Sequence, residues 1–249
     1  MINAIIGALV IGLCLSVFGS GGSILTIPVL LYMVGMSANM AIPSSLLIVG
    51  SIALFSSITF IRQGRVSWKH VLLFGVPGML GTALGAWLAS FVTSYIQLNV
   101  FVVLMLLSSV MMWRNTSAGM QSGTPNLPVT FFYGIVVGSV TGFVGVGGGF
   151  LIIPALVLLG GLTLHFAVGT SLLIIALQSS VGFAKYYTQL APTGGSFDWQ
   201  VIGVMIALGI LGGLAGGTLN QKLPKEKLQK GFALFLVAMA IFVIFRSLL

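Results

Sequence analysis

Two glycine-rich runs are the residues of this chain best suited to chemistry. Gly19, Gly21, Gly22 and Ser23 interrupt one apolar stretch, and Gly145, Gly147, Gly148 and Gly149 interrupt another. Glycine costs about 1 kcal/mol relative to alanine inside a helix, so each run predicts a broken helix or a re-entrant hairpin. A break leaves backbone N–H groups unpaired at a helix N-terminus, where their positive partial charge favours an anion. The alternative interpretation is that these glycines only allow helices to cross closely.

Hydroxyl and amide side chains form a second pair of clusters, each at the start of a long apolar segment. Their members are Asn39, Ser44 and Ser45 in one segment, and His165, Thr170 and Ser171, with Gln178 deeper, in the other. Buried hydroxyls can donate to an oxyanion without the desolvation cost of a full charge. They can equally bond their own or a neighbouring helix, and Asn39 and His165 are also candidate helix N-caps. Gln178 suits either a ligand contact or an interhelical bond.

The composition places these clusters in a membrane. Soluble domains carry roughly 25% charged residues, whereas here 5% are charged, 58% are hydrophobic and the mean hydropathy is +1.18. A surface so poor in charge must be solvated by the lipid bilayer. The net charge of +8 fits basic cytoplasmic loops better than a basic patch that gathers nucleic acid or an anionic substrate. The first residues lack the basic segment of a cleaved signal peptide, so none is expected.

An internal repeat organises the chain. At an offset of 126 residues the two glycine-rich runs coincide, Pro28 lies over Pro154, and Ser45 lies over Ser171. Farther along, the offset grows by five residues, and Gly64, Trp68 and Gly78 lie over Gly195, Trp199 and Gly209. Shared apolar bias does not keep Gly, Pro and Trp in register. We therefore divide the chain into repeat one (1–113), a cytoplasmic linker (114–127) and repeat two (128–249).

Each repeat reads as two short apolar segments followed by three long ones. The predicted segments are 4–18, 23–36, 39–61, 69–91 and 97–113, then 128–144, 150–162, 165–187, 199–220 and 229–248. In the small-residue spacings Gly81 to Gly85 and Gly212 to Gly216 we favour helix packing over a site. The predicted fold is an all-α integral membrane protein, in which each repeat is a broken or re-entrant helix pair plus three transmembrane helices.

Charge patterning predicts opposite orientations for the two repeats. In repeat one the loop after the third segment is basic, with Arg62, Arg65 and Lys69. In repeat two the equivalent loop has Lys185 offset by Asp198, and the next loop is the basic one instead, with Lys222, Lys225, Lys227 and Lys230 against Glu226. By the positive-inside rule the repeats are inverted, as in many secondary transporters, with the glycine breaks expected near the bilayer midplane. Both termini are then outside.

Residues for catalysis, cofactor or metal binding are scarce. Asp198 and Glu226 are the only acids, and both fall in predicted loops. A relay of buried carboxylates therefore has no residues to use, and no carboxylate pair or nucleophile–base pair stands out. We expect no enzyme, no cofactor and no metal site. His165 is the titrating side chain near the candidate site, and a structural role is its alternative.

The motifs together resemble the sulfite exporter TauE/SafE family, also called the TSUP membrane permeases. The repeated Gly-x-Gly-Gly-Gly/Ser run ending at Pro28 and Pro154, the following Ala-x-x-x-Ser-Leu-Leu-Ile, and Gly-x-x-x-Trp carry this resemblance over nearly the full chain. Ser23 departs from it, because the family often has a third glycine there. The resemblance implies a bacterial-type inner-membrane transporter of anions, typically sulfite, sulfonates or organosulfur acids, with the glycine runs and hydroxyl pairs as substrate contacts.

The leading hypothesis is a permease that moves a small, sulfur-containing, anionic substrate by alternating access between inverted halves. The alternatives are a channel-like anion pore on the same donors and a non-transporting accessory membrane subunit. Saturating flux distinguishes a transporter from a pore. The residue types leave the direction of transport, the coupling ion and assembly into a homo-oligomer open.

Overall fold

The structure is a computed structural model that describes residues 2–19, 21–114, 127–146, 149–158, 160–190, 197–222 and 225–248. Over these ranges the chain is helical and contains no strand, which confirms the all-α class. The first half consists of α1 (Ile2–Phe18), α2 (Gly21–Pro28), η1 (Val29–Val34), α3 (Ala38–Arg62), α4 (Trp68–His70), η2 (Val71–Gly75), α5 (Val76–Ala89) and α6 (Ser94–Arg114). The second half consists of α7 (Leu127–Val144), α8 (Gly149–Leu158), α9 (Leu164–Leu190), α10 (Trp199–Lys222) and α11 (Lys225–Leu248).

Four of the described helical stretches are long and apolar enough to cross a membrane. They are Ala38–Arg62, Trp68–Ala89, Leu164–Leu190 and Trp199–Asn220. Shorter apolar helices, such as Ala4–Phe18 and Pro128–Val144, accompany them. Large apolar side chains also cover the outside, because Leu80, Val103 and Leu234 are each more than 60% exposed. An outer surface of this kind is solvated by lipid tails, so the chain is a multi-pass membrane protein.

The predicted segments agree with the helices to within a few residues at most ends, with two internal differences. The expected segment 23–36 changes to π-helix at η1, directly after Pro28, and the expected segment 69–91 contains π-helix at η2, just before Pro77. Proline has no N–H and cannot continue the i→i−4 ladder, which favours wider turns beside it. Lys185 also differs from expectation, since it lies within α9 and not in a loop.

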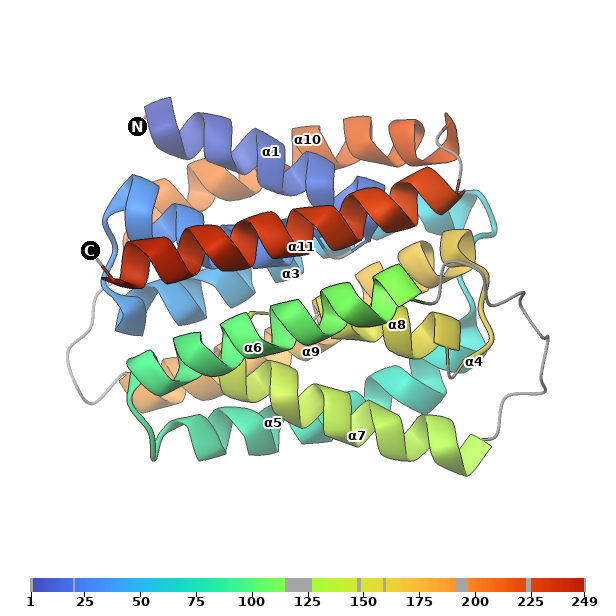
Figure 1. Cartoon of the computed structure of the whole chain (residues 1–249), viewed down its shortest axis with the longest axis horizontal. Coiled ribbons are helices and arrows are strands. Elements are labelled where there is room, and N and C mark those ends of the chain that lie inside the picture. Colours follow the sequence, from blue (N-terminus) through green and yellow to red (C-terminus); the bar gives the residue numbers. More distant parts are fainter. Residues whose placement is uncertain are drawn as a thin grey trace.

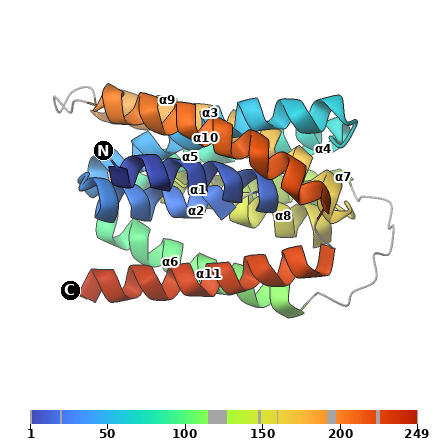
Figure 2. The same ribbon diagram turned by 90° about the horizontal axis from the view of Figure 1, so that it is seen from above.

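Helices of the two halves interleave. Figures 1 and 2 show α1 lying beside α10, α5 beside α7, and α6 beside α11, with α3 and α9 together. Tight glycine contacts form the first two pairs: a Cβ on Gly85 would clash with the Ser139 carbonyl of α7, and one on Gly212 would clash with the Leu9 carbonyl of α1. This confirms packing as the role of those spacings. Neither half is a separate globular unit.

Equivalent helices run in opposite directions. In Figure 1, α3 runs away from the end that holds both termini, whereas α9 runs towards it. The connection from α3 to α4 and the start of α11 lie together at the opposite end. That end therefore carries the basic residues Arg62, Arg65 and Lys69 of one half and the lysine-rich start of α11 of the other. This is the charge distribution on which the predicted inversion depends; of the predicted linker, residues 115–126 lie outside the described ranges.

Candidate functional site

The first glycine run breaks the helix as predicted. Helix α1 ends at Phe18, Gly19 has a left-handed φ of +70°, and α2 begins at Gly21. A side chain at position 19 would be strained by this backbone conformation. It would also meet the other half, because a Cβ there would lie 2.7 Å from Ile153 Cδ1 and 2.9 Å from Val168 Cα. The first break is therefore a tight turn packed against α8 and α9.

The second glycine run makes the equivalent turn. Helix α7 ends at Val144, Gly145 has φ +73°, and α8 begins at Gly149, while Gly147 and Gly148 lie outside the described residues. A Cβ on Gly145 would clash with Ile42, near the start of α3. Each break thus packs against the first turns of the long helix that belongs to the opposite half.

The two equivalent serines bond these breaks reciprocally. Ser45 Oγ donates to the Gly145 carbonyl at 2.9 Å, and Ser171 Oγ donates to the Gly19 carbonyl at 3.1 Å. Each hydroxyl is also within 3 Å of a carbonyl of its own helix, that of Ile42 or Val168. A break releases carbonyl groups that would otherwise be bonded along the helix, and these hydroxyls satisfy one on each side.

Two further side chains satisfy break carbonyls and were not expected from the sequence. Asn220 Nδ2 of α10 donates to Val17 O at 2.6 Å, and the Tyr186 hydroxyl of α9 donates to Gly142 O and Phe143 O at 3.1 and 3.2 Å. Both residues are almost fully buried. They occupy different positions in the repeat, so comparison of the two halves gives no signal for them. Their polarity within apolar helices is the signal that was available.

The glycines after the first break serve packing. A Cβ on Gly22 would clash with the Ile11 carbonyl and lie 2.6 Å from Leu15 Cβ, so α2 folds back closely along α1. Thr26 Oγ1 donates to the Gly22 carbonyl at 2.9 Å, and Ser23 is completely buried. Gly21 and Gly149 are the first residues of α2 and α8. The first two segments therefore form a hairpin with Gly19 at its tip.

The two breaks lie at different depths, which differs from the expectation of a common midplane position. Gly19 contacts Val168 and Gly145 contacts Tyr186 of the same helix α9. These contacts are 186 − 168 = 18 residues apart, roughly 27 Å at the rise of an α-helix. The α1–α2 and α7–α8 hairpins enter from opposite ends and extend past one another (Figure 1). Each tip therefore lies towards the end of the molecule opposite to the one at which its hairpin begins. One small anion cannot touch both breaks at once.

The remaining predicted residues are spread over several contacts. Thr170 Oγ1 accepts a bond from Ser67 N at 3.0 Å, while the equivalent Ser44 hydroxyl is buried without a partner. Asn39 is exposed and its Oδ1 accepts from Ser94 Oγ at 2.6 Å. Asn39 is not the N-cap of α3, because the N-cap is Ser37. His165 is not the N-cap of α9 either, because it is the second residue of that helix, where it is half-buried. A cap must precede the first helical turn, which both residues already occupy.

Gln178 is buried between three helices. Its Oε1 accepts a long bond of 3.4 Å from Thr141 of α7, and its Nε2 lies against Gly78 of α5 without a hydrogen-bond partner. The counterpart of Gln178 in the first half is Ile52, which packs against Gly209 in the same way. The amide therefore takes the place that an apolar side chain occupies at the equivalent packing position of the first half, and the interhelical bond is the contact that the structure shows.

His70 joins the halves at the basic end and was also missed. Its Nε2 lies 3.1 Å from the Gly160 carbonyl, and its Nδ1 lies 2.7 Å from Ser67 Oγ. Because a carbonyl only accepts, Nε2 carries the proton and Nδ1 accepts from the serine. The ring is only 6% exposed. Sequence analysis placed this histidine in a membrane segment without assigning it a contact.

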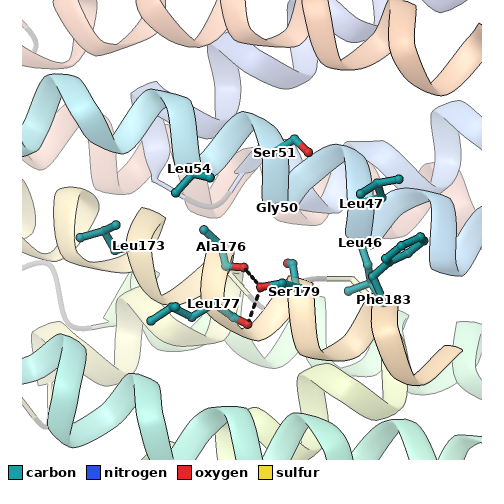
Figure 3. A pocket seen from close by; sticks show the side chains of 11 residues that line it. Leu46, Leu47, Gly50, Ser51, Leu54, Leu173, Ala176, Leu177, Ser179 and Phe183 are labelled. Atoms are coloured by element: carbon teal, nitrogen blue, oxygen red, sulfur yellow. Dashed lines mark hydrogen bonds between the residues drawn. The ribbon is translucent and has the colours of Figure 1, made fainter. Parts of the chain in front are cut away.

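A cavity of about 340 Å³ lies between α3 and α9, at the middle of both helices. Figure 3 shows its lining, which comes from these two facing helices. The lining is mostly apolar, with Leu47, Leu54 and Leu173 among its members, and Ser51, Ser179 and Ser180 as its hydroxyls. Ser179 Oγ is buried without a partner. None of the glycines of the breaks lines this cavity; it lies between the two breaks along the helix axes.

Comparisons with known proteins agree with this architecture. The family model for the sulfite exporter TauE/SafE matches residues 4–243. A probable membrane transporter protein of Xylella fastidiosa (strain 9a5c) is 31% identical over 95% of this chain and 92% of its own length. The probable membrane transporter protein YunE of Bacillus subtilis is 26% identical over 88% of each chain, and one of Methanocaldococcus jannaschii is 24% identical over 96% of this chain and 94% of its own. No solved structure matches.

Proposed function

The chain belongs to the sulfite exporter TauE/SafE family of membrane transporters, and we propose that it moves a small sulfur-containing anion by alternating access between its two halves. The substrate class is sulfite, a sulfonate or an organosulfur acid. We place the protein in a bacterial-type inner membrane with both termini outside. The channel-like pore and the accessory subunit are the alternatives that the experiment below separates.

One observation supports the mechanism. Each half bonds the hairpin tip of the other through a serine, and these two serine–break contacts, which we call latches, lie at opposite ends of the molecule. Ser171 bonds the Gly19 break near the basic end, and Ser45 bonds the Gly145 break near the end that holds the termini. Alternating access needs two gates that open in turn around one cargo position. Opening one latch separates a break from α3 or α9 without disturbing the other, which lies about 27 Å away.

The anionic cargo is supported by the helix ends at the breaks. Helices α2 and α8 begin at the breaks, so their first N–H groups place a positive partial charge there. The chain has ten basic and two acidic residues, so few carboxylates compete with a solute anion. Ser45 and Ser171 then act by holding and releasing the breaks, and the backbone of one break at a time contacts the cargo.

The test is uptake of sulfite, thiosulfate, sulfate, methanesulfonate and acetate into liposomes that contain only the purified chain. We expect saturable uptake of sulfur oxyanions. Ser45→Ala and Ser171→Ala are each expected to lower the maximal rate about two- to tenfold, because one hydrogen bond contributes about 0.5–1.5 kcal/mol to the balance between gate states. Ser57→Ala is the matched control, since Ser57 bonds only the Leu54 carbonyl of its own helix α3.

The outcomes separate the three functions. Flux that rises linearly with concentration and never saturates indicates a pore. No flux of any anion through the purified chain indicates an accessory subunit. Equal rates for the three serine variants would leave the latches without a role in transport and remove the alternating-access mechanism.

A further inference from the structure

Arg65 holds an unpaired charge at the contact between the halves. Its side chain is only partly exposed, its Nη1 atom is buried without a hydrogen-bond partner, and its guanidinium has no ion pair within the described part of the chain. Removing a guanidinium from water without a compensating anion is costly. The neighbouring Arg62 is exposed and carries no such cost. A buried, unpaired guanidinium nitrogen therefore calls for a partner from outside the chain.

The backbone of Arg65 packs against α9 at the level of the first break. A Cβ on Gly169 would clash with the Arg65 carbonyl, and the Ser67 amide donates to Thr170 Oγ1. The flanking residues of α9 hold the break itself: Val168 packs against Gly19, and Ser171 bonds its carbonyl. The Arg65–Ser67 segment and the Gly19 break thus contact four successive residues of α9, about one helical turn.

The residues equivalent to Arg65 and Ser16 in the second half are uncharged. By the repeat register, the counterpart of Arg65 is Ser196 and the counterpart of Ser16 is Gly142. Ser16 precedes the first break by one turn, is fully buried and has an unpaired hydroxyl. Neither counterpart carries a charge. The two breaks are therefore chemically different although their backbones turn in the same way.

Among the side chains that the structure describes, no carboxylate pairs with Arg65, which leaves its charge for an external anion. Asp198, one of the two acids, precedes α10 and its carboxylate accepts from Val201 N. His70 has both ring nitrogens engaged, by Ser67 and Gly160. The exposed cations Arg62 and Lys69 flank Arg65 and raise the local concentration of anions. Arginine offers a planar fork of donors that matches oxyanions in two-point contact.

We propose that Arg65 binds the oxyanion group of the cargo at the first break, so that the basic end carries a charged docking site and the opposite end does not. This inference rests on the proposed transport function. It adds a positively charged binding residue, Arg65, which sequence analysis had assigned only to a basic loop. A phospholipid headgroup presents the same oxyanion chemistry at this depth, and the experiment separates the two sources.

The experiment compares the full chain with Arg65→Gln, Arg65→Lys and the matched control Arg62→Gln in a phosphate-free maltoside detergent. The melting temperature is measured while sulfite or methanesulfonate is titrated, because a ligand of the folded state raises it. A parallel series adds phosphatidylglycerol or phosphatidylcholine. Uptake by the same variants in liposomes gives KM and the maximal rate.

We expect sulfur oxyanions to stabilise the natural chain and Arg62→Gln, and to leave Arg65→Gln unaffected. We expect Arg65→Gln to raise KM about tenfold or more, since hydrogen bonds to a charged group contribute about 1.5–3 kcal/mol. Arg65→Lys keeps the charge without the fork, so its apparent affinity is expected to fall between those of the natural chain and Arg65→Gln. Should Arg65→Gln not fold, the lysine variant carries the test, and an unchanged affinity in it would overturn the proposal.

The opposing results are equally clear. Equal stabilisation of Arg65→Gln and Arg62→Gln would overturn the docking site while leaving the transport function intact. Stabilisation that depends on Arg65 but occurs only with phosphatidylglycerol would assign the guanidinium to a lipid headgroup and overturn its role in capturing solute. If the natural chain neither binds nor moves any anion, the proposed function itself fails.

Discussion

At the scale of single residues, the breaks are held by side chains that satisfy released carbonyls. Ser171 and Asn220 do this around the first break, and Ser45 and Tyr186 around the second. In an apolar environment an unpaired carbonyl costs several kcal/mol, so a glycine turn inside the membrane needs such partners. The glycines make the turn sterically accessible, and the polar side chains make it stable.

The turn glycines are expected to tolerate no side chain. Gly19→Ala combines left-handed strain of about 1–2 kcal/mol with contacts under 3 Å to Val168 and Ile153, so a total loss of about 2–4 kcal/mol is expected. Gly35 also has a positive φ but has nothing within 4 Å, so Gly35→Ala is expected to cost only the strain. Thermal unfolding in detergent measures both. Equal losses would show that packing at the first break contributes nothing.

The Tyr186 hydroxyl gives a second test at this scale. Tyr186→Phe keeps the ring and leaves the Gly142 and Phe143 carbonyls without this donor, so a loss of about 1–3 kcal/mol is expected. Tyr187→Phe, at the exposed neighbouring position, is the control and is expected to change stability by less than about 0.5 kcal/mol. If the denaturation midpoints of the two variants coincide, capping of these carbonyls by Tyr186 is contradicted.

At the scale of helices, glycine contacts set the packing between the halves. Helix α5 approaches α7 along Gly78, Gly81 and Gly85, and α10 approaches α1 along Gly209, Gly212 and Gly216. Lipid tails are as apolar as leucine, so close backbone contact takes the place of hydrophobic burial in joining these helices. Because each pair joins opposite halves, these contacts also define the surface along which the proposed alternating access moves the halves.

Alanine at a contact glycine and at an open glycine of the same kind of helix should act in opposite directions. Gly85→Ala places a methyl group against the Ser139 carbonyl and is expected to destabilise by about 1–3 kcal/mol. Gly203 of α10 has nothing within 4 Å, so Gly203→Ala is expected to stabilise by up to about 1 kcal/mol through helix propensity. Thermal unfolding midpoints that move in the same direction for both would refute the packing role of Gly85.

At the scale of the whole molecule, the sequence predicted the helices well, because they depend on local apolar length. The division into two repeats rests on residues in register and stays a prediction. The sequence also predicted the two breaks, since glycine at a positive φ is a local requirement. The depth of the breaks was wrong, because it depends on how far each hairpin passes the other, which no local pattern encodes. Asn220, Tyr186 and His70 were missed for a related reason: their partners are carbonyls, which every residue has.

The predicted inversion of the halves has its sharpest test in membrane topology. Gln63 and Gln200 are exposed and lie at equivalent turns of the two repeats, one between α3 and α4 and the other at the start of α10. If the halves are inverted and the basic end faces the cytoplasm, Gln200→Cys is labelled by a membrane-impermeant maleimide in intact cells. Gln63→Cys is then labelled only after permeabilisation. Cys14→Ser provides the background, since Cys14 is the single natural cysteine.

Each labelling result has a distinct meaning for the fold. Labelling of both positions from one side would contradict the inversion, because helices α3 and α9 would then cross in the same direction. Labelling from opposite sides with the order reversed would keep the inversion and place the basic end outside. Thr93→Cys, exposed in the connection between α5 and α6, is expected to label with Gln200→Cys, because that connection lies at the end that holds the termini. The three cysteine variants together decide on which side of the membrane Arg65 lies, and hence from which side an anion reaches it first.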